Sequence, residues 1–202
     1  MRRVPTITAP RVVACTIAGL LILAATAVVD VAAQSNKKPG PETFNAKASV
    51  GSEAGRGDAF VTIRIDEWTS EKNIATMEKA LKDGGSAAFV TELRRAPVAG
   101  HFEAAQQSFS IRWARQRETK TGRVISVVVD KPVYFVGAGV PGAKSKEGYD
   151  VAVIQLVMDS SGVGEGTMAA AARVKPGGPD GVEIDAYETA PVKLLSVMKL
   201  IK

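Results

Sequence analysis

A dense group of arginines around one tryptophan is the part of the chain best suited to binding chemistry. Residues 112–117 have the sequence Arg-Trp-Ala-Arg-Gln-Arg, and Lys120 and Arg123 follow closely. Because side chains alternate between the faces of a strand, the tryptophan shares one face with two arginines. Cations beside an indole bind anionic polymers or lipid headgroups by charge and cation–π contacts. The competing interpretation is a hairpin tip kept soluble by its arginines, with the indole in the core. The predicted binding residues are Arg112, Trp113, Arg115, Arg117 and Arg123.

Catalytic groups are scarce. His101 is the sole histidine, so any Ser-His-acid triad or histidine-bearing metal site must include it. No Gly-x-Ser-x-Gly elbow accompanies it. Its position between Gly100 and Phe102 favours a loop or packing role. Carboxylates such as Asp66, Glu67 and Asp130 leave a hydrolase as the less favoured alternative. We therefore expect a protein that is not an enzyme and uses no cofactor.

Two turn-like motifs carry groups that could bind a ligand. The segment 162–166, Gly-Val-Gly-Glu-Gly, resembles a phosphate-binding loop but lacks Gly-Lys-Ser/Thr and a following helix, so it favours a glycine-rich β-turn. Asp159, Ser161 and Glu165 offer oxygens to a calcium ion, but their spacing is not that of an EF-hand. A solvated turn without a metal ion is the expectation.

The first half of the chain beyond residue 43 predicts a strand followed by helices. Residues 59–65 alternate β-branched apolar residues with polar ones, as a half-buried strand does. A helix is predicted over 70–83 and, after Gly84-Gly85, a shorter one over 86–95. Their apolar faces are formed by Ile74, Met77, Leu81, Phe89, Val90 and Leu93.

The second half predicts mainly strands joined by short turns. The strands are expected near residues 109–114, 124–129, 133–136, 151–158, 167–174 and 182–187, while 192–201 fits either a helix or a bulged strand. The fold class is therefore α+β: a large antiparallel sheet of eight or nine strands, curled into an open barrel or sandwich, with a short helical pair inserted after the second strand. This element order resembles the helix-grip fold, whose long closing helix needs more than the roughly 11 residues from Val192.

The first 33 residues have the organisation of an export signal. Arg2, Arg3 and Arg11 are followed by an uncharged run over 12–29 and by Val-Ala-Ala before Gln34. This pattern predicts a signal peptide cleaved after residue 33. An uncleaved membrane anchor is the alternative, since 18 apolar residues reach the lower limit for a spanning helix. Lipidation of Cys15 is disfavoured because the apolar run follows the cysteine.

Cleavage would leave a linker over 34–43 and a single β-rich domain over 44–202, about 169 residues in all with the linker. Cys15 is the only cysteine, so thiol catalysis and disulfides are excluded from the mature chain. Loss of three arginines and one aspartate lowers the net charge from +5 to +3, which is too small to indicate nucleic-acid binding. The expected location is the periplasm or the exterior, with membrane contact only through an uncleaved signal.

Residues 122–130 and 159–167, together with the signal, resemble bacterial exported proteins that carry a β-rich domain. That resemblance implies no activity. The expected function is a non-enzymatic envelope domain that binds a polymer, a protein, an anionic envelope component or an apolar small molecule. A structural or assembly subunit is the alternative.

Overall fold

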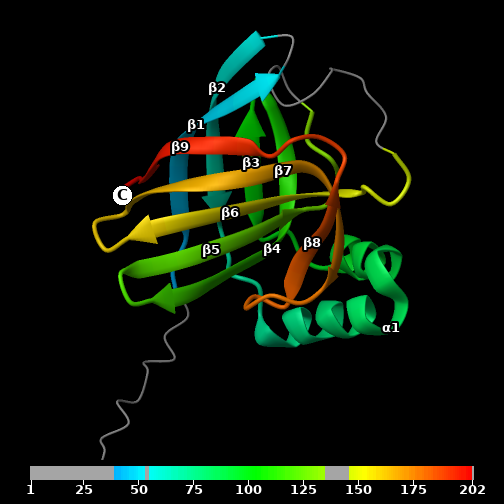
Figure 1. Ribbon diagram of the computed structural model, residues 1–202. Coiled ribbons are helices and arrows are strands. Elements are labelled where there is room, and N and C mark those ends of the chain that lie inside the picture. Colours follow the sequence, from blue (N-terminus) through cyan, green and yellow to red (C-terminus); the bar gives the residue numbers. More distant parts are fainter. Residues whose placement is uncertain (1–38, 53–54, 135–145, 202) are drawn as a thin grey trace, which may run out of the picture. The chain divides into compact units, whose positions relative to one another are not determined.

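Nine strands and one helical element make up most of the described chain (Figure 1). The computed structural model describes residues 39–52, 55–134 and 146–201, which belong to one compact unit. The elements are β1 (Glu42–Ser52), β2 (Gly55–Ile65), α1 (Glu71–Arg95), β3 (Gly100–Ala104), β4 (Gln107–Thr119), β5 (Gly122–Val129), β6 (Val151–Asp159), β7 (Val163–Pro176), β8 (Val182–Tyr187) and β9 (Val192–Lys199).

Eight antiparallel strands close into a barrel. Their order is β6-β5-β4-β3-β2-β1-β9-β7, and β7 also pairs with β6. The ninth strand, β8, continues from the barrel as the partner of the last residues of β7. The prediction of a β-rich α+β fold is confirmed, whereas the open barrel or sandwich is wrong. Closure pairs backbone groups that would otherwise form two open sheet edges.

The barrel interior is the main hydrophobic core. Inward-facing residues of the eight strands form one cluster, and its largest fully buried members are Phe44, Ile63, Ile65, Phe102, Ile111 and Ile125. An eight-stranded barrel is just wide enough for side chains to fill it. Space for a ligand is therefore expected at the barrel ends and on the outer wall.

The helix α1 covers part of the outer wall. The Ser70 hydroxyl caps it by accepting a hydrogen bond from the Asn73 amide at 3.3 Å. The six predicted apolar positions are buried, as expected from their spacing. They pack in a second cluster with Trp113, Val128, Val151 and Val174 of the barrel wall.

The two separate short helices predicted after the second strand are instead one bent element. Gly85 has φ 68° and ψ −164°, and helical backbone resumes directly after it. A glycine adopts this conformation without steric cost, so the chain changes direction at one residue without a loop. The Ser86 hydroxyl, directly after this bend, accepts a hydrogen bond from the Val174 amide at 3.5 Å.

Several boundaries follow from pairing between distant strands. The segment from Val192 is the strand β9, and positive φ at Ser196 accompanies an irregular register with β1. β1 begins at Glu42, inside the predicted linker, because Glu42 pairs with Ile65. The signal peptide over 1–33 and most of the strand predicted over 133–136 lie outside the described residues, and 133–134 are not in a strand.

Candidate functional site

The arginine-rich hairpin formed by β4 and β5 is divided between two sides of the barrel wall. A register shift between Ile111 and Trp113 breaks the alternation of β4. Ile111 and Ala114 therefore belong to the barrel core, while Trp113 lies in the cluster under α1 and is 1% exposed. A bulge of this kind turns the following side chains to the opposite face.

Each predicted arginine has a carboxylate partner. Arg112 Nε lies 2.6 Å from Asp130 Oδ2, and Arg115 Nη1 lies 3.3 Å from Glu78 Oε1. The remaining pairs are Arg117 Nε with Asp180 Oδ1 at 3.3 Å and Arg123 Nη2 with Glu42 Oε2 at 2.7 Å. The structure thus places the predicted binding residues in separate ion pairs, of which only the last faces a large hollow.

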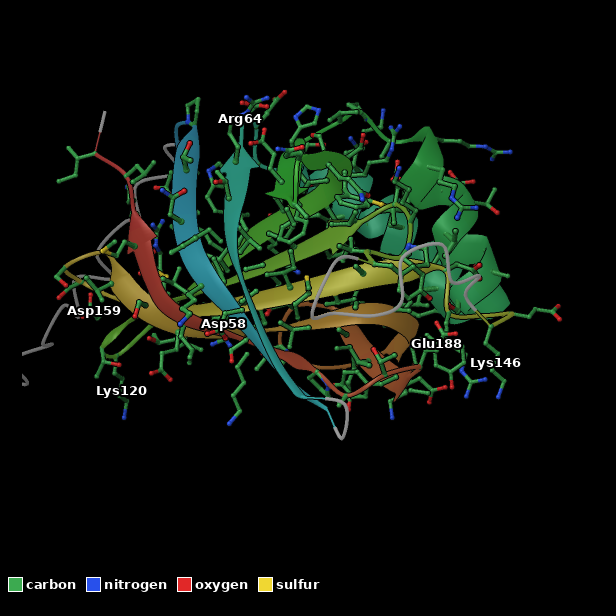
Figure 2. All side chains as sticks on the ribbon, turned by 90° about the horizontal axis from the view of Figure 1, so that it is seen from above. Asp58, Arg64, Lys120, Lys146, Asp159 and Glu188 are labelled. Carbon is green, nitrogen blue, oxygen red and sulfur yellow. The ribbon has the colours of Figure 1, made fainter. Side chains whose placement is uncertain are left out.

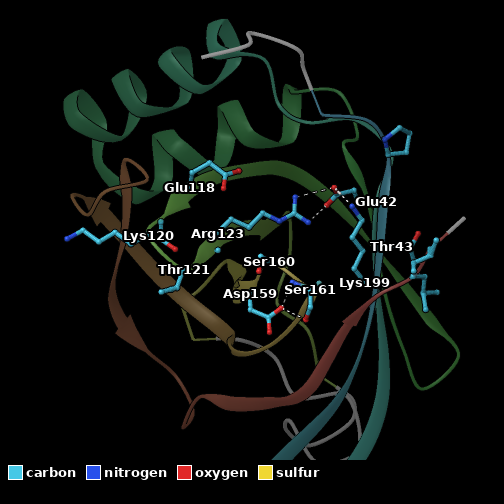
Figure 3. Close-up of a pocket in the computed structure, with 16 residues that line it drawn as sticks. Glu42, Thr43, Glu118, Lys120, Thr121, Arg123, Asp159, Ser160, Ser161 and Lys199 are labelled. Atoms are coloured by element: carbon cyan, nitrogen blue, oxygen red, sulfur yellow. Dashed lines mark hydrogen bonds and ion pairs between the residues drawn. The ribbon is translucent and has the colours of Figure 1, made fainter. Parts of the chain in front are cut away.

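That hollow, the barrel mouth, occupies one end of the barrel and has a volume of about 830 Å³. Figure 3 shows it bounded by the start of β1, the β4–β5 turn, the β6–β7 turn and the end of β9. Lys120 and Asp159 lie at this same end of the molecule (Figure 2). These four segments gather polar groups from distant parts of the chain.

The floor of the barrel mouth is a network around Glu42. Arg123 donates to both carboxylate oxygens, at 3.1 and 2.7 Å, and to Gln116 Oε1 at 2.6 Å. Lys199 Nζ donates to the same carboxylate at 2.8 Å. The Arg123 guanidinium also lies 5.8 Å from the centre of the Phe44 ring, within cation–π range. The network therefore rests directly on the apolar core.

The electrostatics of this network favour a charged Glu42. Burial raises the pKa of its carboxyl, but hydrogen bonds from Arg123 and Lys199 and their positive charges outweigh that effect. The resulting pKa lies below the ordinary value of 4.5. Two cations thus share one ionised carboxylate, which leaves the floor with an excess positive charge.

The turn considered for calcium binding is closed by its own hydrogen bonds. Asp159 Oδ1 accepts from the Ser161 amide at 2.8 Å, the Ser161 hydroxyl at 2.6 Å and the Val163 amide at 3.0 Å. These bonds, led by that of the Ser161 hydroxyl, lower the pKa of Asp159. Among the residues that the structure describes, no three histidine, cysteine or acidic side chains are grouped to hold a metal ion.

The glycine-rich segment lies mostly within a strand. Gly164 and Gly166 belong to β7, and the turn ends at Gly162. A Cβ on Gly164 would stand 2.0 Å from the carbonyl oxygen of Val157 on β6. These glycines thus permit close approach of two strands, which accounts for them without a phosphate ligand.

His101 lies in β3 beside a charged pair on the barrel exterior. Its Nδ1 is 3.1 Å from Arg64 Nη2 and 3.7 Å from Asp66 Oδ2, and Arg64 Nε lies 3.1 Å from Asp66 Oδ1. Arg64 and Asp66 pair directly, so the carboxylate serves a surface ion pair. Asp130, another of the carboxylates named for a hydrolase, pairs with Arg112.

Glu42, Gln116 and Lys199 were not predicted as site residues. Glu42 and Lys199 are 157 positions apart, and neither belongs to a recognisable motif. One feature of the sequence indicated Glu42 as a site residue. Glu42, Phe44 and Ala46 stand at every second position, which places the carboxylate on the inward face of β1.

No protein-family model, curated protein or solved structure matches the chain. In the described part of the chain, no helix has the length and apolar character needed to cross a membrane.

Proposed function

We propose that this chain is an exported, non-enzymatic domain that binds a small organic anion in the barrel mouth. The observation that carries the proposal is the convergence of Arg123 and Lys199 on a single carboxylate at the floor of the hollow. An ammonium group has three donors, and one of those of Lys199 goes to Glu42. The other donors are available to a carboxylate or phosphate.

The rim of the barrel mouth supports an organic rather than a purely inorganic ligand. Pro41, Leu200 and Ile201 line it, and the last two are 42% and 97% exposed. Lys120 adds a cation at the rim and Glu118 and Asp159 add two carboxylates there, so the excess positive charge is confined to the floor. An anion with a short apolar body would place its charge on the floor and its body against these side chains. Export and an envelope location rest on the signal pattern of residues 1–33.

Calorimetric titration with octanoate and with inorganic phosphate tests the proposal. Replacing Lys199 with Gln should weaken binding by at least about tenfold, since a hydrogen bond to a charged group contributes about 1.5–3 kcal/mol. Replacing Lys193, an exposed lysine on the same strand that does not line the mouth, should leave binding unchanged. Added salt should weaken binding to the parent protein.

Glu42→Gln provides a test with the opposite sign. Because the Glu42 carboxylate competes with the ligand for the two cations, its replacement should strengthen anion binding. Absence of binding to either anion, or an equal loss with Lys193→Gln and Lys199→Gln, would refute the proposal.

A structural or assembly subunit is the second candidate. Val163 and Met198 are cross-strand partners on the outer wall and are 46% and 51% exposed, and Val157 on the neighbouring strand is 58% exposed. Adjacent exposed apolar side chains are typical of surfaces that associate. Sedimentation should then show concentration-dependent self-association that Met198→Lys abolishes.

A further inference from the structure

A second, smaller hollow lies between β8 and the outer wall of the barrel. It has a volume of about 300 Å³, at the lower end of the range for small-molecule pockets. One side is the outer wall formed by β4 to β7, and the other is β8 with the preceding turn. In Figure 1, β8 crosses the strands of this wall beside α1. We call this hollow the β8 cleft.

The wall of the β8 cleft carries a row of three polar side chains. If β8 packed directly on this wall, apolar side chains would be expected there instead. Ser126, Gln155 and Thr167 are consecutive cross-strand partners on β5, β6 and β7. The next pair along β5 and β6 is apolar, Val128 with Val153. Gln155 and Thr167 are exposed, and within the described part of the chain neither side chain has a hydrogen-bond partner. Their amide and hydroxyl groups are therefore available to a ligand.

Hydrogen bonds of Asp180 fix the opposite side of the cleft. Asp180, in the turn before β8, is 5% exposed, and its Oδ2 accepts from the Ser126 hydroxyl at 2.6 Å. Its Oδ1 accepts from Arg117 Nε at 3.3 Å, and its carbonyl oxygen accepts from Arg115 Nη1 at 3.4 Å. The Asp180 carboxylate is thus occupied by protein donors, and the turn is tied to the barrel wall.

We propose that the β8 cleft binds one ring of an uncharged sugar. The free amide and hydroxyl suit a polyhydroxylated ligand, and the Tyr187 ring, 46% exposed, offers an apolar face to a pyranose. The residues that line the cleft include Asp180 and Glu183 but no lysine or arginine, which disfavours anions. This inference goes beyond the proposed function and does not depend on it, because the barrel mouth is lined by other residues.

Titration of the isotope-labelled chain with N-acetylglucosamine, followed by NMR, tests the proposal. The signals of the Trp113 indole and the Gln155 side-chain amide should shift and saturate. Gln155→Ala and Tyr187→Ala should each raise the Kd about tenfold, while Gln107→Ala, which removes an exposed glutamine at the start of β4, should not. Thermal melts of the variants establish that each remains folded.

Further arms of the titration separate the sources of the sugar. The β-1,4-linked tetramer of N-acetylglucosamine should bind with the same affinity per ring if the cleft takes single sugars. It should bind more tightly if the sugar belongs to a glycan chain. Both results support the assignment. Inorganic phosphate should leave the two signals unchanged. The proposal is overturned if neither sugar gives saturable shifts up to about 50 mM. Equal Kd values for Gln155→Ala and Gln107→Ala would overturn it as well.

Discussion

The Arg123 guanidinium binds both carboxylate oxygens of Glu42, at 3.1 and 2.7 Å, across 81 positions of sequence and at one end of the barrel. The side chains of Arg123 and Glu42 are only 15% and 9% exposed. Bidentate pairs between arginine and a carboxylate are among the stronger polar contacts in proteins. This pair joins β5 to β1 around the barrel mouth, and Lys199 adds the end of β9.

The first prediction concerns acid stability. Because the pKa of Glu42 is lowered in the folded chain, its stabilising contribution is complete above the ordinary value of 4.5. That contribution is lost as the pH falls through the lowered pKa, since protonation removes the charge that Arg123 and Lys199 bind. Chemical denaturation at a series of pH values should show a smaller loss below pH 4.5 for Glu42→Gln than for the parent. Parallel curves for the two proteins would contradict this account.

The second prediction concerns the contact of β6 with β7. A methyl group on Gly164 would meet the Val157 carbonyl oxygen at 2.0 Å, so the strands must separate. Gly164→Ala should lower the free energy of unfolding by about 1–3 kcal/mol. Gly40→Ala is the matched control, because no atom lies within 4 Å of its Cβ position. Equal midpoints of urea denaturation for the two variants would show that β7 can shift without cost.

The third prediction concerns the contact of α1 with the outer wall. Leu81 is 1% exposed and packs in the cluster that contains Trp113. Leu81→Ala should lower the free energy of unfolding by about 2–5 kcal/mol, through lost burial and the cavity left behind. Lys82→Ala, at the neighbouring exposed position, should change it by less than about 0.5 kcal/mol. A Leu81→Ala effect as small as that of the control would place this face of α1 outside the core.

The fourth prediction concerns the turn before β8. Asp180→Ala would leave the Ser126 hydroxyl and the Arg117 guanidinium without their partner, at a cost of about 1–3 kcal/mol. Asp185→Ala removes a more exposed carboxylate paired with Arg173, which contributes about 0–1 kcal/mol. Thermal unfolding should rank the two variants in that order. The reverse order would mean that the hydrogen bonds of Asp180 do not hold the turn.

The fifth prediction concerns export. The signal pattern predicts cleavage after residue 33, so the intact mass of the protein from an envelope fraction should correspond to a chain that begins at Gln34. A mass that includes residues 1–33 would instead indicate an anchored protein.

Local features of the sequence determined the types of the elements. The alternation over 59–65 predicted β2, and the spacing of Ile74, Met77 and Leu81 predicted the buried face of α1. These patterns are readable because a strand or helix with one buried face repeats its apolar residues with a fixed period. The same reasoning predicted a β-rich antiparallel fold, but not all of its strands: β3 was not among those predicted, and residues 133–134 of a predicted strand are not in a strand.

Only the tertiary structure decided which strands are neighbours and which side chains meet. Alternation shows that a strand has a buried face, but it is the same for a sandwich, an open barrel and the closed barrel observed. The irregularity beside Trp113 moved the indole out of the barrel core that contains Phe109 and Ile111, because one extra residue in a strand reverses every later side chain. Glu42 and Lys199 meet only because β9 pairs with β1, and no local property of either segment encodes that pairing.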